Sequence, residues 1–157
     1  MTVEDKLRQM GLELPEAPTP VASYVPTVRT GNLVFISGQV PREKGEMKYR
    51  GHIGAELTID DGRAAARICA LNALAALKKE IGDLDRVRRI VKVSGFVASS
   101  AGFTDQPKVI DGASTFLVEL FGDIGRHARA AVGVNELPLG AAVEVEMIVE
   151  VESEPRA

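Results

Sequence analysis

The sequence has very few residues that could form a metal site or a disulfide. Its 157 residues include one cysteine, Cys69, and two histidines, His52 and His127. A single cysteine excludes a disulfide within the chain. The cysteine and the histidines lack the spacing of metal ligands, and the glutamates near the C-terminus lie along one predicted strand rather than in a loop cage. We therefore expect no metal site.

The sequence also lacks a long apolar run and a strong excess of one charge. With 45% hydrophobic residues, 26% charged residues and a net charge of -3, it is typical of an ordinary globular protein. Nucleic acid is not the expected partner, because phosphate binding needs a clustered basic surface. No segment resembles a membrane span, and the first residues are polar and acidic, unlike a secretory signal. We expect a cytoplasmic protein.

The length fits a single domain, which an N-terminal extension precedes. Residues 1–20 begin with a short predicted helix, in which Thr2 and Asp5 form a capping box, and continue as a tether with Pro15, Pro18 and Pro20. We expect this helix to be an appendage. Residues 21–157 are then the domain that contains the hydrophobic core.

The alternation of strand and helix patterns predicts an α+β fold. Strands are predicted at residues 23–28 and 33–40 around a turn at Gly31-Asn32, and again at 89–98, 128–134 and 142–152. Residues 41–54 are predicted to form a short third strand or a mobile loop. Helices are predicted over residues 58–80 and from about 107 to 122, each with an apolar stripe. Two such helices cannot cover both faces, so we expect a single antiparallel or mixed sheet with both helices packed on one face.

The last predicted strand has one apolar side and one mainly acidic side. Strand alternation directs Val143, Val145, Met147, Val149 and Val151 toward the helices, and Glu144, Glu146, Ile148, Glu150 and Glu152 away from them. Elsewhere in the sheet this second face is only partly polar. We therefore expect it to be covered by self-association in a closed homo-oligomer.

Arg129 is the residue whose surroundings best suit ligand binding. Its neighbours Ala128, Ala130 and Ala131 are small, so its planar guanidinium could approach a small carboxylate and donate two parallel hydrogen bonds. The alternative is a solvated arginine on an edge strand, which residue type alone favours. A catalytic triad of Ser37, His127 and Asp111 has little support, because no Gly-x-Ser-x-Gly turn surrounds the serine.

Several motifs, in this order, resemble those of the RidA (YjgF/YER057c/UK114) family. They are Gly31-Asn32, Ile36-Ser37-Gly38-Gln39, Arg129, Leu137-Pro138 and Val143-Glu144-Val145-Glu146, within residues 24–151. The resemblance implies a chorismate-mutase-like α+β fold and a homotrimer with sites between its subunits. Residues 21–157 are then a RidA-like domain.

The resemblance also implies an activity and assigns roles to residues. It implies hydrolysis of reactive enamines and imines, such as 2-aminoacrylate, to a 2-keto acid and ammonia, with no cofactor. Arg129 matches the arginine that grips the substrate carboxylate, and Glu144 matches the glutamate that positions or activates water. Tyr24 and Ser37 match residues that line the pocket. The alternative is a trimeric protein that binds a small carboxylate, such as a 2-keto acid, without turnover.

Three positions depart from the family pattern. Ala131, which we also expect in the substrate-binding pocket, stands where relatives usually have a cysteine. Asp111 lies near the position of an asparagine and His127 replaces a proline, and both are possible site residues. His127 and Arg129 should share one strand face, which makes the histidine an alternative base. A ribonuclease activity has been attached to some relatives, but this acidic chain shows no basic groove for it.

Overall fold

The computed structural model describes residues 1–19 and 22–154. Its helices are α1 (Val3–Gln9), α2 (Ile59–Ile81) and α3 (Gln106–Phe121), with 3-10 turns η1 (Leu84–Arg86), η2 (Gly122–Gly125) and η3 (Pro138–Gly140). Its strands are β1 (Thr27–Thr30), β2 (Leu33–Gln39), β3 (Arg42–Glu43), β4 (Glu46–Met47), β5 (Val87–Ala98), β6 (Ala128–Val134) and β7 (Val143–Val151). The predicted α+β class is confirmed.

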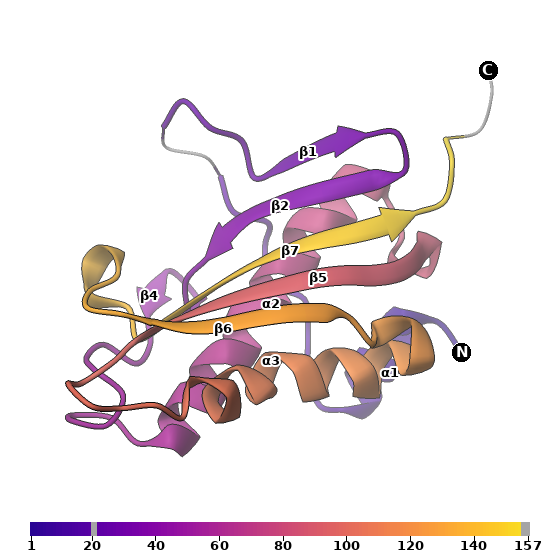
Figure 1. Ribbon diagram of the computed structural model, residues 1–157. Coiled ribbons are helices and arrows are strands. Elements are labelled where there is room, and N and C mark those ends of the chain that lie inside the picture. Colours follow the sequence, from indigo (N-terminus) through magenta and orange to yellow (C-terminus); the bar gives the residue numbers. More distant parts are fainter. Residues whose placement is uncertain (20–21, 155–157) are drawn as a thin grey trace.

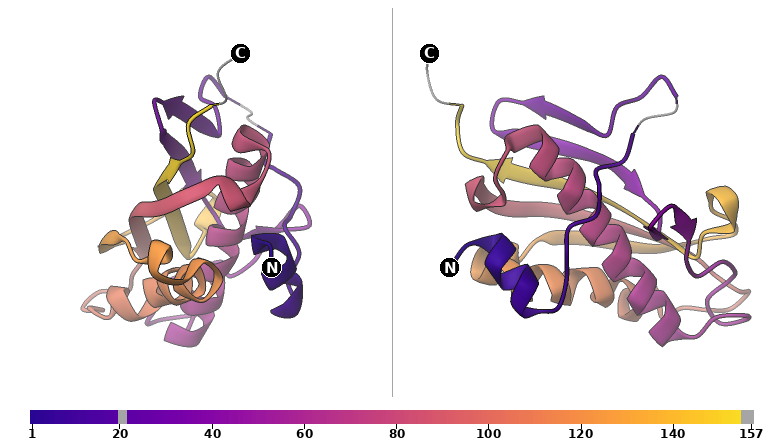
Figure 2. Two further views of the ribbon diagram at one scale, coloured as in Figure 1. Left: turned by 90° about the vertical axis from the view of Figure 1, so that its right-hand side faces the viewer. Right: turned by 180° about the vertical axis from the view of Figure 1, so that it is seen from behind.

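One mixed sheet forms the centre of the fold, in the order β1-β2-β7-β5-β6. The β5–β6 pair is parallel, and the other neighbours are antiparallel. α2 and α3 cover one face of this sheet, while the other face is open in the single chain (Figures 1 and 2). The prediction of a mixed sheet with both helices on one face is therefore confirmed.

The expected and observed strands differ most in two regions. The first strand begins at Thr27 rather than near Ser23, directly after Pro26, which has no backbone N–H for a ladder. The region after β2 forms a separate hairpin, β3–β4. The later segment around His52 contributes only isolated bridges, one of them between Ile53 and Ser99.

α2 forms the centre of the helical layer. Thr58 and Asp61 make the predicted capping box, and the buried side of the helix is rich in alanine and leucine. α3 crosses α2 closely at Gly112, where a Cβ would overlap the main-chain oxygen of Arg63. Glycine at this position therefore lets the two helix backbones approach each other.

The N-terminal helix is not the appendage that we expected. α1 packs near α3 and η1, and its Leu7 is 1% exposed within the hydrophobic core. The Val3 N–H also donates to the Asp85 carboxylate over 2.8 Å. The sequence pattern showed an amphipathic helix, but not the apolar surface on α3 that it covers.

No helix in the described ranges is long and apolar enough to cross a bilayer.

Candidate functional site

Arg129 lies near the start of β6 and is held by two side chains of α3. Its Nη1 donates to the Asp111 carboxylate over 2.7 Å and to the Ser114 hydroxyl over 3.2 Å. The Arg129 side chain is 24% exposed and that of Asp111 is 43% exposed. The ion pair is therefore accessible from solvent but fixed in position. We refer to Arg129, Asp111, Ser114 and His127 as the anchor cluster.

His127 completes the anchor cluster through Ser114. Its Nδ1 lies 2.7 Å from the Gly125 carbonyl oxygen, and its Nε2 lies 2.8 Å from Ser114 Oγ. Because a carbonyl oxygen only accepts, Nδ1 carries the proton of the neutral ring and Nε2 accepts from the Ser114 hydroxyl. The lone pairs of Ser114 Oγ are then available to Arg129. His127 shares a face with Arg129, as the sequence predicted.

The neutral form of His127 is also favoured electrostatically. Burial lowers the pKa of His127 below its usual value, and the positive charge of Arg129 lowers it further, against the hydrogen bond to Gly125. A protonated ring would donate from both nitrogens and would reverse the bond to Ser114. The lowered pKa therefore favours the neutral ring, in which Nε2 accepts from the Ser114 hydroxyl.

The contacts within the anchor cluster use one of the three guanidinium nitrogens. Among the described residues, Nε and Nη2 of Arg129 make no hydrogen bond. These two nitrogens form one edge of the planar group, with parallel N–H bonds that match the two oxygens of a carboxylate. The arginine is thus held at Nη1 and can bind an anion at its other edge.

The sheet register places this cluster on the helix-covered face of β6. Arg129 pairs with Val93 of β5, which is fully buried under the helices. Ala131 pairs with Gly95, points the same way and packs against the core. Ala131 is therefore beside Arg129 on the same strand face, where a larger side chain would meet the core.

Glu144 lies on the opposite, open face of the sheet. Val143 and Val145, its neighbours on β7, are fully buried against the helices. The Glu144 carboxylate lies over Gly38 of β2, where a Cβ would overlap Oε1. Burial raises the pKa of the Glu144 carboxyl, and the charge of Glu146 adds to this shift. Among the described residues, the carboxylate accepts no hydrogen bond.

Ser37 precedes Gly38, the residue that lies beneath this glutamate. β2 has a register shift between Ile36 and Gln39, and Ser37 and Gly38 lie within it. The Ser37 hydroxyl donates to the Val25 carbonyl over 2.6 Å, which ties the segment before β1 to this irregularity. Tyr24, one residue earlier, is 58% exposed. We refer to Ser37, Gly38 and Glu144 as the glutamate cluster; Tyr24 is connected to it through the next residue, Val25.

The two clusters do not meet within one chain. β5 lies between β6 and β7, which separates the two strands by about 10 Å. Glu144 aligns through Phe96 with Val132, three residues from Arg129 along β6 and on the other face. A site that contains both Arg129 and Glu144 therefore needs two chains. The Ser37-His127-Asp111 triad is not formed, because Ser37 is in the other cluster.

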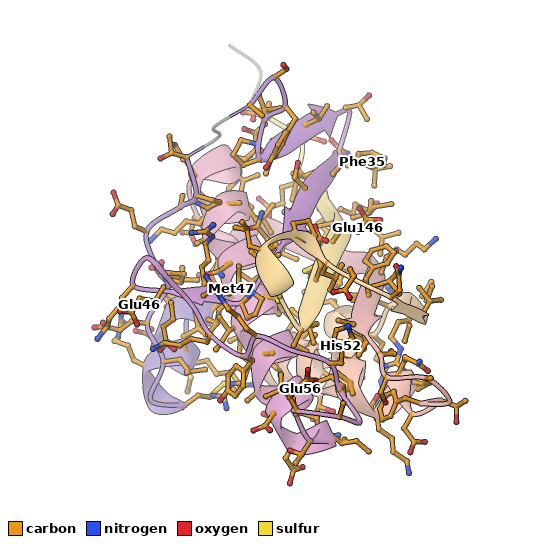
Figure 3. The ribbon with its side chains drawn as sticks, turned by 90° about the vertical axis from the view of Figure 1, so that its left-hand side faces the viewer. Phe35, Glu46, Met47, His52, Glu56 and Glu146 are labelled. Atoms are coloured by element: carbon orange, nitrogen blue, oxygen red, sulfur yellow. The ribbon has the colours of Figure 1, made fainter. Side chains whose placement is uncertain are left out.

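The open face of the sheet is hollowed and partly apolar. A hollow of about 380 Å³ is lined by Val28, Phe35, Ile36, Ser37, Lys92, Ser94, Glu146, Met147 and Ile148. Val28 is 55% exposed and Phe35 is 43% exposed. Figure 3 shows Phe35 and Glu146 on the side of the sheet away from α2. Such a surface suits the self-association that we expected from the sequence.

His52 lies outside both clusters. Its Nε2 is 2.8 Å from the Asn135 carbonyl oxygen and 3.2 Å from the Glu136 carboxylate, and Glu56 lies on its other side (Figure 3). It joins the loop before α2 to the loop after β6. In the part of the chain that the structure describes, no group of three or more His, Cys, Asp or Glu side chains is placed to hold a metal.

The sequence did not predict the roles of two cluster residues, Ser114 and Gly38. Ser114 follows Asp111 by three residues on a predicted helix, a spacing that puts both side chains on one face. That spacing could have identified Ser114 once Asp111 was a candidate. The role of Gly38 beneath Glu144 depends on the pairing of β2 with β7, for which the sequence gave no direct signal.

Comparison with known proteins gives consistent matches over most of the chain. The family described as YjgF/chorismate mutase-like, putative endoribonuclease, matches residues 4–151. Protein TCP17 of Trypanosoma cruzi is 46% identical over 149 residues, which are 94% of this chain and 93% of that protein. A 2-iminobutanoate/2-iminopropanoate deaminase of Dermatophagoides farinae is 32% identical over 141 residues, or 90% and 95% of the two chains. The crystal structure of a protein of unknown function from Agrobacterium tumefaciens superimposes with a TM-score of 0.91 at 43% identity, covering 96% of this chain and 92% of that one.

Proposed function

The chain belongs to the YjgF/RidA family, and from this premise we propose that it is a hydrolytic deaminase of reactive enamines and imines. The substrates are of the 2-aminoacrylate type, and the products are a 2-keto acid and ammonia. A small-molecule partner is consistent with the family, which includes a 2-iminobutanoate/2-iminopropanoate deaminase. The geometry of the anchor cluster supports a substrate that carries a carboxylate.

This proposal rests on how the Arg129 guanidinium is hydrogen-bonded. Asp111 and Ser114 hold Nη1, while the edge formed by Nε and Nη2 is left for a carboxylate. An anchor that is already oriented loses little conformational entropy when it binds. The alternative explanation is a solvated surface arginine, whose guanidinium would be hydrogen-bonded to water rather than to Asp111 and Ser114 of α3.

The proposed reaction needs only proton transfers and water. An enamine takes a proton at its terminal carbon and releases one from its nitrogen, and it thereby becomes the isomeric imine. Water adds to the imine carbon, so that a C–O bond forms, the C=N π electrons move to nitrogen, and a proton of the water reaches that nitrogen. The hydroxyl of this adduct then passes its proton to the amino nitrogen, the oxygen electrons form the C=O bond, the C–N bond breaks, and ammonia leaves with the C–N bonding electrons. One imine and one water thus give one keto acid and one ammonia.

Glu144 is the proposed proton carrier for these steps. Half-burial and the nearby Glu146 raise the pKa of its carboxyl, which makes the carboxylate a better base than an exposed one. As a base, Glu144 would take a proton from the attacking water and then return it to the departing nitrogen. Its position over Gly38 fixes the direction from which the water is activated.

A complete site requires a second chain, and we propose a homotrimer. Within one chain the two clusters lie on opposite faces of the sheet, and the open face carries exposed apolar residues such as Val28 and Phe35. Packing of identical chains would cover this face and bring the Arg129 of one chain beside the Glu144 of another. The cytoplasmic location expected from the sequence stays a prediction.

Steady-state kinetics of Arg129 variants test the proposed function. With 2-iminopropanoate generated in situ, the wild-type protein should release 2-ketopropanoate, and R129Q should raise KM by about 100-fold through the lost charged hydrogen bonds. R129K should recover only part of this loss, since lysine lacks the planar fork. R88Q is the matched control, because Arg88 is an exposed arginine on β5.

An inactive wild-type protein would reject the deaminase. If imines from a panel of amino acids are not turned over, yet 2-keto acids raise the melting temperature of the wild type and not of R129Q, the protein binds a small carboxylate without turnover. This is the alternative that the sequence left open. A ligand that binds only the folded state raises Tm in this way.

A further inference from the structure

A second set of polar side chains lies between α2 and α3, away from both clusters. Here the helical layer has a groove of about 220 Å³, lined by Arg63, Ala64, Arg67, Gly112, Thr115, Phe116 and Glu119. We call it the α2–α3 groove. The two helices cover the sheet on the side away from its open face (Figure 2). None of the lining residues belongs to the anchor cluster or the glutamate cluster.

The two arginines of this groove differ from the other arginines of similar burial. Arg63 and Arg67 are partly buried, as are Arg29, Arg86 and the side chain of Arg129, which is paired with Asp111. Arg29 pairs with Glu154 at 2.7 Å, and Arg86 lies 4.0 Å from Glu152. Arg63 and Arg67 have no acidic group within that distance among the described residues. Two guanidinium groups are therefore held in one groove without a counter-ion.

The Arg67 guanidinium is also incompletely hydrogen-bonded. Its Nε is the one buried side-chain nitrogen or oxygen in the described part of the chain that has no hydrogen-bond partner. The guanidinium carbon lies 5.7 Å from the centre of the Phe116 ring, which attracts the cation but accepts no ordinary hydrogen bond. A buried donor without an acceptor costs free energy, and an anion beside this guanidinium would offset the cost of its unpaired charge.

The neighbouring side chains define what such an acceptor can be. One guanidinium nitrogen of Arg63 donates a hydrogen bond to the Lys108 carbonyl over 3.1 Å. Arg63 and Arg67 are four residues apart in α2 and therefore lie on the same face of the helix. Glu119 lines the groove and is exposed, with no ion pair to either arginine within 4 Å. The groove thus has two fixed positive charges and one movable negative charge at its rim.

We propose that the α2–α3 groove is a binding site for a small oxyanion of the phosphate class, either free phosphate or the end of a phosphate monoester. Two guanidinium groups match the charge of a phosphate dianion, and their N–H bonds suit its several oxygens. The Thr115 hydroxyl at the groove is a further donor. The groove volume fits a compact anion. Glu119 competes with the anion for the arginines.

Phosphate titration of the full-length protein tests this site. At constant ionic strength, isothermal calorimetry with inorganic phosphate should give saturable binding with a Kd on the order of 1 mM, and amide signals of Gly112 and Thr115 should shift in nuclear magnetic resonance spectra. R67Q and R63Q should each weaken binding by about tenfold. E119Q should tighten binding, because it removes the competing carboxylate and keeps the shape of the side chain.

Two further variants separate this site from other positive charges. R88Q removes an exposed arginine outside the groove and should bind phosphate like the wild type. R129Q removes the anchor arginine, and in this variant the phosphate-dependent shifts of the Gly112 and Thr115 amide signals, which report the groove, should persist. Binding that falls equally in R88Q would show non-specific charge attraction and overturn the proposal. Binding that is lost in R129Q but kept in R67Q would assign the phosphate to the anchor cluster and overturn it too. Absence of saturation in the wild type and in E119Q would also reject the site.

Discussion

Arg129 and Glu144 occupy opposite faces of the same sheet, on strands that are separated by β5. Arg129 is held against α3, and Glu144 lies on the open face over Gly38. Each chain therefore contributes an anion anchor to one site and a carboxylate to another, provided that chains associate through these faces. This relationship makes the proposed activity a property of the assembly rather than of the single chain.

Mixing two inactive variants should restore activity. R129Q keeps Glu144, and E144Q keeps Arg129, so mixed trimers contain some sites with both native residues. Random assembly gives a native pair in roughly a quarter of the sites when each site combines residues of two chains. The experiment is to unfold and refold an equal mixture and to measure imine hydrolysis. Activity no higher than that of the separate variants would contradict a site between subunits.

Gly38→Ala should lower kcat by about tenfold or more, because its Cβ would displace the Glu144 carboxylate from its position. The binding of 2-keto acids should change little, since Arg129 is untouched. A double-mutant cycle checks the cause: in the E144Q background, Gly38→Ala should have almost no further effect on turnover. An equal loss in both backgrounds would mean that the substitution acts through the fold of β2 and not through Glu144.

Ser114→Ala should weaken substrate binding more than turnover. Ser114 gives Arg129 Nη1 its second acceptor, and a hydrogen bond of this kind contributes about 1 kcal/mol, or roughly a fivefold rise in KM. We expect kcat to change by less than about twofold. Ser114→Thr keeps the hydroxyl and should recover the KM, provided that its methyl group is accommodated. A fall in kcat at constant KM would instead place Ser114 in the chemical steps.

Glu144→Gln should stabilise the protein at neutral pH while it removes activity. The pKa of Glu144 in the folded state is raised above its ordinary value of 4.5. The protonated carboxyl therefore contributes to the free energy of unfolding below pH 4.5, and this contribution is lost as the pH rises through the raised pKa. At pH 7 the ionised, half-buried carboxylate is therefore unfavourable. Since the group is partly exposed, we expect the variant to gain only about 1–3 °C in Tm at pH 7 and less near pH 4.

Thermal unfolding of E144Q and of the wild type across this pH range measures the difference. E43Q is the control, because Glu43 is exposed on the β3–β4 hairpin. A variant that is less stable than the wild type at pH 7, or a gain that is largest at low pH, would mean that the native carboxylate is stabilised by its surroundings.

Leu7→Ala should destabilise the fold, although it lies close to the N-terminus. Leu7 is 1% exposed within the core, and truncation of a buried leucine costs about 2–5 kcal/mol. For a chain of this size, Tm should fall by about 5–15 °C. Arg8→Ala removes a neighbouring exposed side chain and should leave Tm nearly unchanged. If both substitutions change Tm by an equally small amount, α1 does not contribute to the stability of the fold and is an appendage.

The arrangement of elements could be read from the sequence because it depends on local patterns. The capping box at Thr58 and the apolar stripe that follows predict α2, and the alternation of valine and glutamate predicts both faces of β7. The start of β1 could not be placed from such a pattern. Pro26 has no N–H to donate to a neighbouring strand, and this matters only once the pairing with β2 is known. The burial of Leu7 likewise depends on a surface that α3 provides.

The candidate residues were identified from the sequence, but not their grouping. Arg129 and His127 were expected on one strand face, and Asp111 was a separate candidate. In the fold Ser114 bonds both Arg129 and His127, and Asp111 bonds Arg129 directly. Ser37 and Gly38 come to Glu144 through the pairing of β2 with β7, and the Ser37 hydroxyl binds the Val25 carbonyl next to Tyr24. A side chain's chemistry is visible in its residue type, whereas its neighbours follow from strand order.

The sequence by itself determined the secondary structure, the apolar and acidic faces of the last strand, and the arginine suited to hold a carboxylate, because these depend on residue type and spacing along the chain. Only the tertiary structure decided that Arg129 is held by α3, that Glu144 lies over Gly38, and that the two are on opposite faces. Strand order and register bring together residues that are distant in sequence, and no local pattern contains that information.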